Sequence, residues 1–438
     1  MTGDIWVAVL LIGVLFFLFG TGIWIGLSLI GVGAVAMWLF AAARPAGDAM
    51  ATTIFGSISS WTLTALPLFI WMGEILFRTA ISQAMFTSLA PWMTRLPGRL
   101  LHTNIIGCTI FAAVSGSSAA TCATIGKMTI PELKKRGYPD ELTIGSLAGA
   151  GTLGLLIPPS IIMIVYGVAA EVSIAKLFIA GVIPGIILAA LFSGYVAVWA
   201  LLNPGKVPPS DIVMSFGRKV WETRALIPVA LLILLVLGSI YTGIATATES
   251  AALGVVGAFL IALFQKRLDW QTFWDSVMGA TRLSSMIMLI LAGSSFLSLS
   301  MGFTGLPRHL AEWIASLGLS PAMLIGALTV FFIILGCFLD GISMVVLTIA
   351  ILLPVVQQAG FDLIWFGIFI VLVVEMAQIT PPVGFNLFVL QGMTGRSIFW
   401  IGRVALPFFF MMAAAVAITY VFPETVTWLP SQMVNAAR

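Results

Sequence analysis

Two short polar segments interrupt apolar stretches of the chain and contain the residue types that bind small ions. The first reads Val114-Ser-Gly-Ser-Ser-Ala-Ala-Thr121, and the second reads Leu339-Asp-Gly-Ile-Ser-Met344. Glycine lets the backbone approach a ligand closely, and hydroxyl side chains supply oxygen ligands without adding charge. The hydroxyl residues in and near these segments are Ser115, Ser117, Ser118, Thr121, Ser343 and Thr380.

A proline pair follows each polar segment at a matching distance. Pro131 and Pro354 each precede a Pro-Pro pair by 27 residues, as Leu156-Ile-Pro-Pro-Ser160 and Ile379-Thr-Pro-Pro-Val383 show. From the tip glycine to the first proline of the pair, the two distances are 42 and 40 residues (Gly116 to Pro158, Gly341 to Pro381). Proline lacks a backbone donor and clashes with the preceding helical turn. A helix must therefore break at Pro158, Pro159, Pro381 and Pro382.

A broken helix at membrane depth has a specific chemistry. Irregular backbone is tolerated there only inside protein or beside a water-filled cavity. The break frees carbonyl oxygens, which suit a hard cation such as sodium. The N-termini of the half-helices bring positive dipole ends and free amides, which suit an anionic group. The two segments and the two breaks together predict a binding site for cations and an anion.

The composition places these segments in a membrane. Of 438 residues, 60% are hydrophobic and 8% are charged, and the mean hydropathy is +1.13. Soluble globular chains carry roughly a quarter charged residues, so this chain cannot cover a water-facing surface of its size. The N-terminus has no Lys or Arg before the first apolar run, which argues against a cleaved signal peptide.

Because open backbone is costly in lipid, every span is expected to be helical. We predict ten full spans, at about 4–19, 22–41, 61–78, 141–168, 176–201, 225–242, 248–265, 279–301, 362–392 and 400–422. The spans at 141–168 and 362–392 contain the proline pairs and are the predicted broken helices. The apolar segments at about 101–133 and 321–356 are interrupted by the polar tips, and we predict that each is a re-entrant helical hairpin.

If both segments are re-entrant hairpins, the basic residues fall mainly on one side of the membrane. Sixteen fall in one set of loops and four in the other, which is a strong positive-inside bias. The larger set is Arg78, Arg95, Arg99, Lys127, Lys134, Lys135, Arg136, Lys206, Arg218, Lys219, Arg224, Lys266, Arg267, Arg282, Arg396 and Arg403, and the smaller is Arg44, Lys176, Arg308 and Arg438. The first hairpin then opens from the cytoplasm and the second from outside, with both termini outside.

Hairpin and broken helix recur in the same order with opposite orientation, which is the pattern of an inverted repeat. The first repeat is predicted at 1–202 and the second at 225–438. Residues 203–224, with Pro204, Pro208 and Pro209, form a polar cytoplasmic linker. An amphipathic helix lying on the membrane fits the range Ile212–Trp221 within it.

Other motifs do not indicate an enzyme or a nucleotide site. Gly149-Ala-Gly-Thr-Leu-Gly154 matches GxGxxG but lies in a membrane helix with no preceding strand. Gly126-Lys127 lacks the rest of a phosphate-binding loop. The cysteines (Cys108, Cys122 and Cys337) form no CxxC pair, and His102 and His309 are far apart in sequence, which disfavours metal or haem chemistry.

Four acidic residues lie in or beside apolar runs, where charge is expensive and usually functional. Asp340 and Glu375 are next to the second polar site and are candidates for a role there. Glu74 and Glu249 fit equally well with pairing at a helix interface or at a helix end.

At the same positions the sequence resembles a known family. The runs FAAVSGSSAATCATIG, GTLGLLIPPSIIMIVYG, LFIAGVIPG, IYTGIATATESAALG and EMAQITPPVGFNLFV look like the large membrane subunit of tripartite ATP-independent periplasmic (TRAP) transporters, the DctM-like permeases. The resemblance covers nearly the whole chain. It implies an all-α polytopic membrane protein with the inverted-repeat fold of ion transporters, and an elevator-like movement of the part that holds both hairpins.

The resemblance also implies partners and ligands. The partners would be a small four-helix membrane subunit on a separate chain, a periplasmic solute-binding protein, an organic acid as substrate and membrane lipid, with no nucleic acid. Uptake would be driven by sodium ions and need no cofactor, in a bacterial inner membrane. One sodium site would involve Ser117, Ser118, Gly154, Ile157 and Pro159, and the other Gly341, Ala377, Thr380 and Val383. The substrate would lie near Ser115, Gly116, Ser117, Ser118, Ser343 and Asn386.

Two other functions stay open at this stage. A self-sufficient sodium/carboxylate symporter of the wider ion-transporter type would share the hairpins and broken helices but need no binding protein. A non-transporting membrane protein, such as a respiratory-complex subunit or a membrane enzyme, would be expected to carry intramembrane clusters of His, Lys or Cys.

Overall fold

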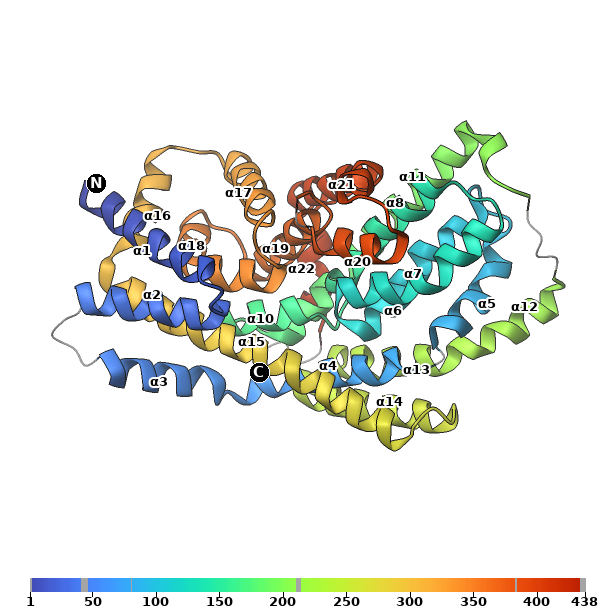
Figure 1. Ribbon diagram of the computed structural model, residues 1–438, viewed down its shortest axis with the longest axis horizontal. Helices are drawn as coiled ribbons and strands as arrows, with labels where there is room; N and C mark the ends of the chain where they lie inside the picture. The colour runs from blue at the N-terminus through green and yellow to red at the C-terminus, as the bar shows by residue number, and fades with distance from the viewer. Residues whose placement is uncertain (1, 41–45, 80, 210–213, 383, 434–438) are drawn as a thin grey trace.

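The computed structural model describes residues 2–40, 46–79, 81–209, 214–382 and 384–433, and across these ranges it consists of helices and the turns that join them (Figure 1). The helices before the linker are α1 (Thr2–Gly20), α2 (Ile25–Phe40), α3 (Ala46–Ile58), α4 (Ala65–Phe77), α5 (Ile81–Met93), α6 (His102–Ser115), α7 (Ser118–Lys135), α8 (Asp140–Gly151), α9 (Leu153–Leu156), α10 (Ile161–Ala169) and α11 (Ile174–Leu202).

The helices after α11 are α12 (Phe216–Thr223), α13 (Ile227–Tyr241), α14 (Ala247–Phe264), α15 (Trp270–Thr304), α16 (Leu306–Ser316), α17 (Pro321–Leu335), α18 (Gly341–Gln358), α19 (Leu363–Gln378), α20 (Phe385–Thr394), α21 (Ile398–Val421) and α22 (Glu424–Ser431). Four short 3-10 helices join them: η1 (Trp61–Thr64), η2 (Arg99–Leu101), η3 (Pro204–Lys206) and η4 (Arg224–Leu226). Each of the ten predicted spans overlaps at least one of these helices.

Six helices of the described part are long and apolar enough to cross a bilayer, and eight are if each of two bent helix pairs counts as one span. The bent pairs are 46–77, with a bend of 55°, and 140–169, with a bend of 42°. The prediction of an all-α polytopic membrane protein is therefore confirmed. The re-entry of the hairpins from opposite sides, and with it the inverted repeat, stays a prediction.

The first predicted hairpin is present as α6 and α7, which pack side by side. Its tip needs glycine, because Gly116 ends α6 in the left-handed region with φ +61°. The next residue begins α7, since the Ser117 hydroxyl accepts a hydrogen bond from the backbone N–H of Ala120 at 3.4 Å. The polar tip seen in the sequence is thus a helix C-cap followed directly by an N-cap.

The second predicted hairpin corresponds to α17 and α18, which pack on other helices rather than closely on one another. Both pack on α19, and α18 packs on α10, α15 and α16 as well. Asp340 caps α18 by accepting hydrogen bonds from the backbone N–H groups of Ile342 (3.1 Å) and Ser343 (3.3 Å). Asp340 therefore has a structural role that the sequence left open, namely to begin the inner arm of this hairpin.

Both predicted broken helices are confirmed. The first runs from α8 through α9 to α10 and is interrupted at 157–160, and the second runs from α19 to α20 with the interruption at 379–384. The bonds Pro158–Pro159 and Pro381–Pro382 are both cis. Ser160 restarts the first helix, because its hydroxyl accepts a hydrogen bond from the N–H of Met163 at 3.4 Å.

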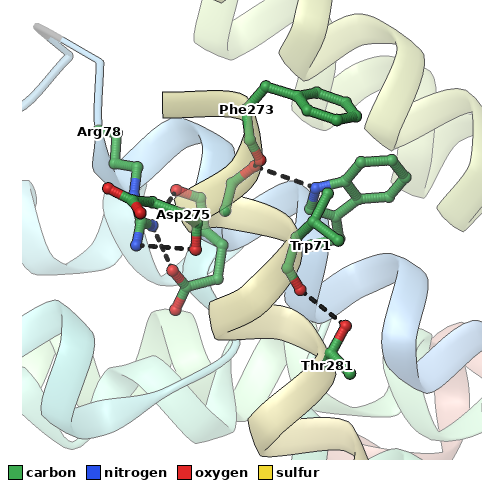
Figure 2. A network of polar contacts seen from close by, with 8 residues as sticks. Trp71, Arg78, Phe273, Asp275 and Thr281 are labelled. Carbon is green, nitrogen blue, oxygen red and sulfur yellow. Dashed lines mark hydrogen bonds and ion pairs between the residues drawn. The ribbon is translucent and has the colours of Figure 1, made fainter. Parts of the chain in front are cut away.

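The longest helix, α15, runs along α2, α3 and α4 (Figure 1). It begins nine residues before the predicted span at 279–301, because Asp269 caps it through the N–H of Thr272 at 2.6 Å. Figure 2 shows the polar contacts that fix α4 on α15: the Trp71 indole N–H donates to the Ser276 hydroxyl at 3.1 Å, and the Arg78 guanidinium donates to the Asp275 carbonyl at 3.3 Å.

Glu74 and Glu249, for which the sequence left two interpretations open, both have structural partners. Glu74 forms an ion pair with Arg78 one turn along α4, and its carboxylate lies against Gly279 of α15, so it pairs at a helix interface. Glu249 closes a capping box with Thr246 at the start of α14, so it lies at a helix end. Glu74 therefore realises the first alternative, pairing at a helix interface, and Glu249 the second, a position at a helix end.

Several helices were not predicted from the apolar runs, namely α3, α5, α16 and α22. Each is between 8 and 13 residues long, which is too short to span a bilayer on its own. The linker contains α12, which begins at Phe216 rather than at Ile212. Residues 212 and 213 of that predicted helix lie outside the described residues.

The ion pair on α4 gives a test of this interface. Replacing Arg78 by Ala leaves the Glu74 carboxylate half-buried against α15 without its partner, and we expect the free energy of unfolding to fall by about 1–3 kcal/mol. The matched control is Arg308→Ala, which removes an equally spaced pair with Glu312 whose side chains are 82% and 55% exposed. We expect it to cost less than about 0.5 kcal/mol. Equilibrium unfolding in mild detergent measures both, and equal losses would contradict the interface role of Glu74.

Candidate functional site

The tip of the first hairpin lies directly against the first broken helix. A Cβ atom added at Gly154 would lie 2.5 Å from the carbonyl oxygen of Ser117, and one added at Gly116 would lie 3.0 Å from the carbonyl oxygen of Pro159. The backbone N–H of Ile161 donates to the carbonyl of Gly116 at 3.4 Å. Glycine at both positions therefore allows main chain to meet main chain at this contact.

Uncharged oxygen atoms gather at this contact. The hydroxyl groups of Ser115 and Thr121 are 2.6 Å apart, and the Ser115 hydroxyl lies 3.4 Å from the carbonyl oxygen of Ser117. The Thr121 hydroxyl is also close to Gly154, at 2.7 Å from the position of an added Cβ. Carbonyl and hydroxyl oxygens are the ligands that hard cations prefer, so the residues present fit a sodium ion.

The same tip is bonded to the second broken helix. The Ser118 hydroxyl donates a hydrogen bond to Oε1 of Glu375 in α19, and the two residues are 3% and 1% exposed. The other carboxylate oxygen of Glu375 is buried and has no hydrogen-bond partner among the described residues. Glu375, whose role the sequence left open, thus links a segment of the first half to a segment of the second.

Asn386, in the first turn of α20, lies on the same side of α7. It is fully buried, and both its amide nitrogen and its amide oxygen lack partners among the described residues. Its Nδ2 atom lies 3.5 Å from the position of a Cβ added at Gly151, and the Cβ of Cys122 lies 2.8 Å from that position. Because Ser118 and Cys122 are one helical turn apart, Glu375 and Asn386 meet neighbouring turns of α7.

The tip of the second hairpin contacts both broken helices. A Cβ added at Gly341 would lie 2.7 Å from Val374 and 2.9 Å from Gln378 in α19, and 3.0 Å from Ile162 in α10. Ser343 is buried, and its hydroxyl donates to the Asp340 carboxylate within the same turn. The hydrogen bonds of Ser343 therefore stay within its own hairpin and do not reach Asn386.

The residues predicted for the second sodium site lie around the break after α19. The Thr380 hydroxyl donates to the carbonyl of Met376 at 2.7 Å, and the methyl group of Ala377 packs against Gly336. The carbonyl oxygens of Gln378 and Thr380 each lie 2.9 Å from the position of a Cβ added at Gly384. Two carbonyl oxygens thus lie near the same point, and carbonyl oxygens are ligands that suit a cation. Val383, also predicted for this site, lies outside the described residues.

The structure therefore brings together most of the first predicted set. Ser115, Gly116, Ser117, Ser118, Gly154 and Pro159 form one contact, and Asn386 lies beside it. The side chain of Ile157 packs against Gly185 of α11, so only its backbone is available to a ligand. Glu375 was missing from the predicted ligands, although a carboxylate inside an apolar run was the signal that could have included it.

The fold is one that a known membrane transporter also has. The crystal structure of the Alcanivorax borkumensis YdaH transporter superposes with a TM-score of 0.62, and the match covers 86% of this chain and 89% of that one. The sequence identity is 13%, so this likeness concerns the fold alone.

Sequence comparison identifies the family. Residues 12–425 match the family model of the DctM component of the tripartite ATP-independent periplasmic transporters. The C4-dicarboxylate large permease protein DctM of Rhodobacter capsulatus is 32% identical over 94% of this chain and 97% of its own length. Its namesake in Pseudomonas aeruginosa is 32% identical over 87% and 89%. The chain belongs to the DctM family of TRAP transporter large permeases.

A third relative is longer than this chain. The isethionate TRAP transporter permease protein DctMQ of Oleidesulfovibrio alaskensis is 33% identical over 93% of this chain but only 64% of its own length. The chain thus spans under two thirds of that relative, while it spans nearly all of the two DctM proteins.

The close contact at Gly154 can be tested by a single methyl group. We expect Gly154→Ala to lower the free energy of unfolding by about 1–3 kcal/mol, because the new methyl would collide with the main chain of the hairpin tip. The matched control is Gly392→Ala in α20, where nothing lies within 4 Å of an added Cβ. We expect the control to be neutral or slightly stabilising. Tryptophan fluorescence during unfolding measures both, and a tolerated Gly154→Ala would contradict the contact.

Proposed function

We propose that this chain is the large membrane subunit of a sodium-coupled transporter that takes up an organic acid. A periplasmic binding protein would deliver the acid, and a small membrane subunit would complete the transporter in a bacterial inner membrane. Both termini of this chain would then be periplasmic. The chain would act as a transporter and not as an enzyme.

The observation that carries this proposal is the junction at the first hairpin tip. The tip meets the first broken helix through Ser117 and Gly154, and it meets the second through Ser118 and Glu375. A cation held at the tip is thereby placed between the two breaks, where freed carbonyls and half-helix N-termini are available for charged ligands. Binding of cation and anion at one junction is what coupled transport requires.

The chemistry of the junction supports an anion as cargo. The N-termini of α7 and α20 both lie at the junction, with Ser118 and Asn386 in their first turns. Helix N-termini favour negative groups, and the unpaired amide of Asn386 offers two further donors. The names of the relatives described above specify C4-dicarboxylate and isethionate, which are both organic acids.

The family also supports the tripartite assembly over the self-sufficient symporter. The family description names a tripartite periplasmic transporter of which DctM is one component, and the DctMQ relative shows that a large permease can occur within a longer chain. We infer that the hairpins and broken helices move as one body against the scaffold of α2, α3, α4 and α15, in an elevator-like manner. The interlocked tips and breaks favour such a rigid body, since each tip contacts both broken helices.

The proposal predicts sodium-dependent uptake. In proteoliposomes with the small subunit and the cognate binding protein, an inward sodium gradient should raise the initial rate of uptake at least tenfold over a potassium gradient of equal size. The organic acid is identified beforehand as the solute that the binding protein retains on purification. Uptake at equal rates with both gradients contradicts sodium coupling, whereas uptake without the binding protein would favour the self-sufficient symporter.

Thr380 offers a test of the second cation site. Thr380→Val keeps the shape of the side chain but removes its hydroxyl, so we expect the sodium concentration for half-maximal uptake to rise about tenfold, which corresponds to about 1.4 kcal/mol. The matched control is Thr394→Val at the end of α20, whose hydroxyl likewise bonds the carbonyl four residues back, at 2.7 Å. An equal sodium requirement in the two variants would exclude Thr380 as a ligand.

A further inference from the structure

We propose that Glu375 supplies the negative charge that balances a cation bound at the first hairpin tip, so that this cation site is built from both halves of the chain. The proposal rests on the proposed function, because it assigns a residue to the sodium site described there. It adds a charged group to a site that otherwise consists of hydroxyl and carbonyl oxygens.

An unpaired charge at Glu375 is costly. Glu375 is 1% exposed in the last turn of α19, an apolar helix in which the neighbouring side chains Val374 and Met376 are also buried. No Lys or Arg of the described residues forms an ion pair with it, whereas Glu74, Glu132, Glu312 and Asp140 each have one. A buried carboxylate without a counter-charge is strongly unfavourable. Its position is explained if a cation is its partner.

The second argument is the geometry of its two oxygens. Oε1 accepts the hydroxyl of Ser118, which fixes the carboxylate beside the tip. Oε2 is buried and without a partner among the described residues. Buried polar atoms are nearly always paired. A cation at the tip would complete the coordination of this oxygen.

Glu375 lies close in the chain to the second break and to a residue that contacts the second hairpin. It is on the last turn of α19 before the second break, and its neighbour Ala377 packs on the outer arm of the second hairpin at Gly336. A cation drawn towards Glu375 therefore pulls on the helix that carries the second cation site. Glu375 would thereby couple the occupation of the first cation site to that of the second.

The test is the thermal stability of the purified chain as a function of sodium. Sodium chloride is varied at constant pH and ionic strength, with choline chloride as the replacement, so the readout needs no substrate and no partner. In the wild type we expect the melting temperature to rise with sodium to a plateau. Glu375→Gln keeps the volume and an acceptor for Ser118 but removes the charge. We expect it to melt at a higher temperature without sodium and to need at least tenfold more sodium for the half-maximal rise.

A higher melting temperature without sodium together with a raised sodium midpoint is expected only if Glu375 balances the charge of the cation. A merely structural role would lower the melting temperature and leave the sodium midpoint unchanged. The matched control is Glu249→Gln, whose capping box tolerates glutamine, and it should behave like the wild type. Should Glu375→Gln fail to accumulate, Glu375→Asp keeps the charge but withdraws it by one methylene group. We expect at least a threefold higher sodium midpoint for that variant.

Two results overturn the proposal, and they differ in what else they affect. A wild type stabilised by sodium, with an unchanged sodium midpoint in the Glu375 variant that is obtained, overturns this inference and leaves sodium coupling intact. A wild type whose melting temperature does not respond to sodium overturns both the inference and the sodium coupling proposed above.

Discussion

The structure depends on the high cost of unpaired backbone groups inside a membrane. Breaking two helices at Pro158-Pro159 and Pro381-Pro382 leaves carbonyl and amide groups that lipid cannot satisfy. The hairpin tips lie against these breaks at distances that only glycine permits, as at Gly116 and Gly154. The tips thus cover the broken backbone, and the same contact gathers the hydroxyl and carbonyl oxygens of the candidate site. Stability and function have the same origin here.

This constraint explains why so much of the site could be predicted from the sequence. Proline pairs and glycine-serine tips have few structural alternatives within apolar runs, and helices end at both proline pairs and at both tips. The cap residues follow the same logic, because Ser117 and Ser160 stand where a helix must restart. Caps and breaks of this kind depend on a few neighbouring residues, so they can be predicted without knowledge of the tertiary structure.

What the sequence could not supply was the pairing between segments far apart. The contact from Ser118 to Glu375 joins residues 257 positions apart, and nothing in either segment specifies the other. The different environments of the two arms of the second hairpin were equally hidden, since α17 and α18 are both apolar but only α18 also packs on α10, α15 and α16. Short helices such as α3 and α16 were not predicted, because they have no apolar run long enough to indicate a membrane span.

We propose that two cation sites, one at each break, are linked through a junction made by both halves. The most direct measurement of this link is the equilibrium binding of radioactive sodium to the purified chain over a wide range of concentration. We expect saturable, sigmoidal binding with more than one sodium ion per chain and a Hill coefficient above one. Binding of a single ion, or a simple hyperbolic curve, would contradict it.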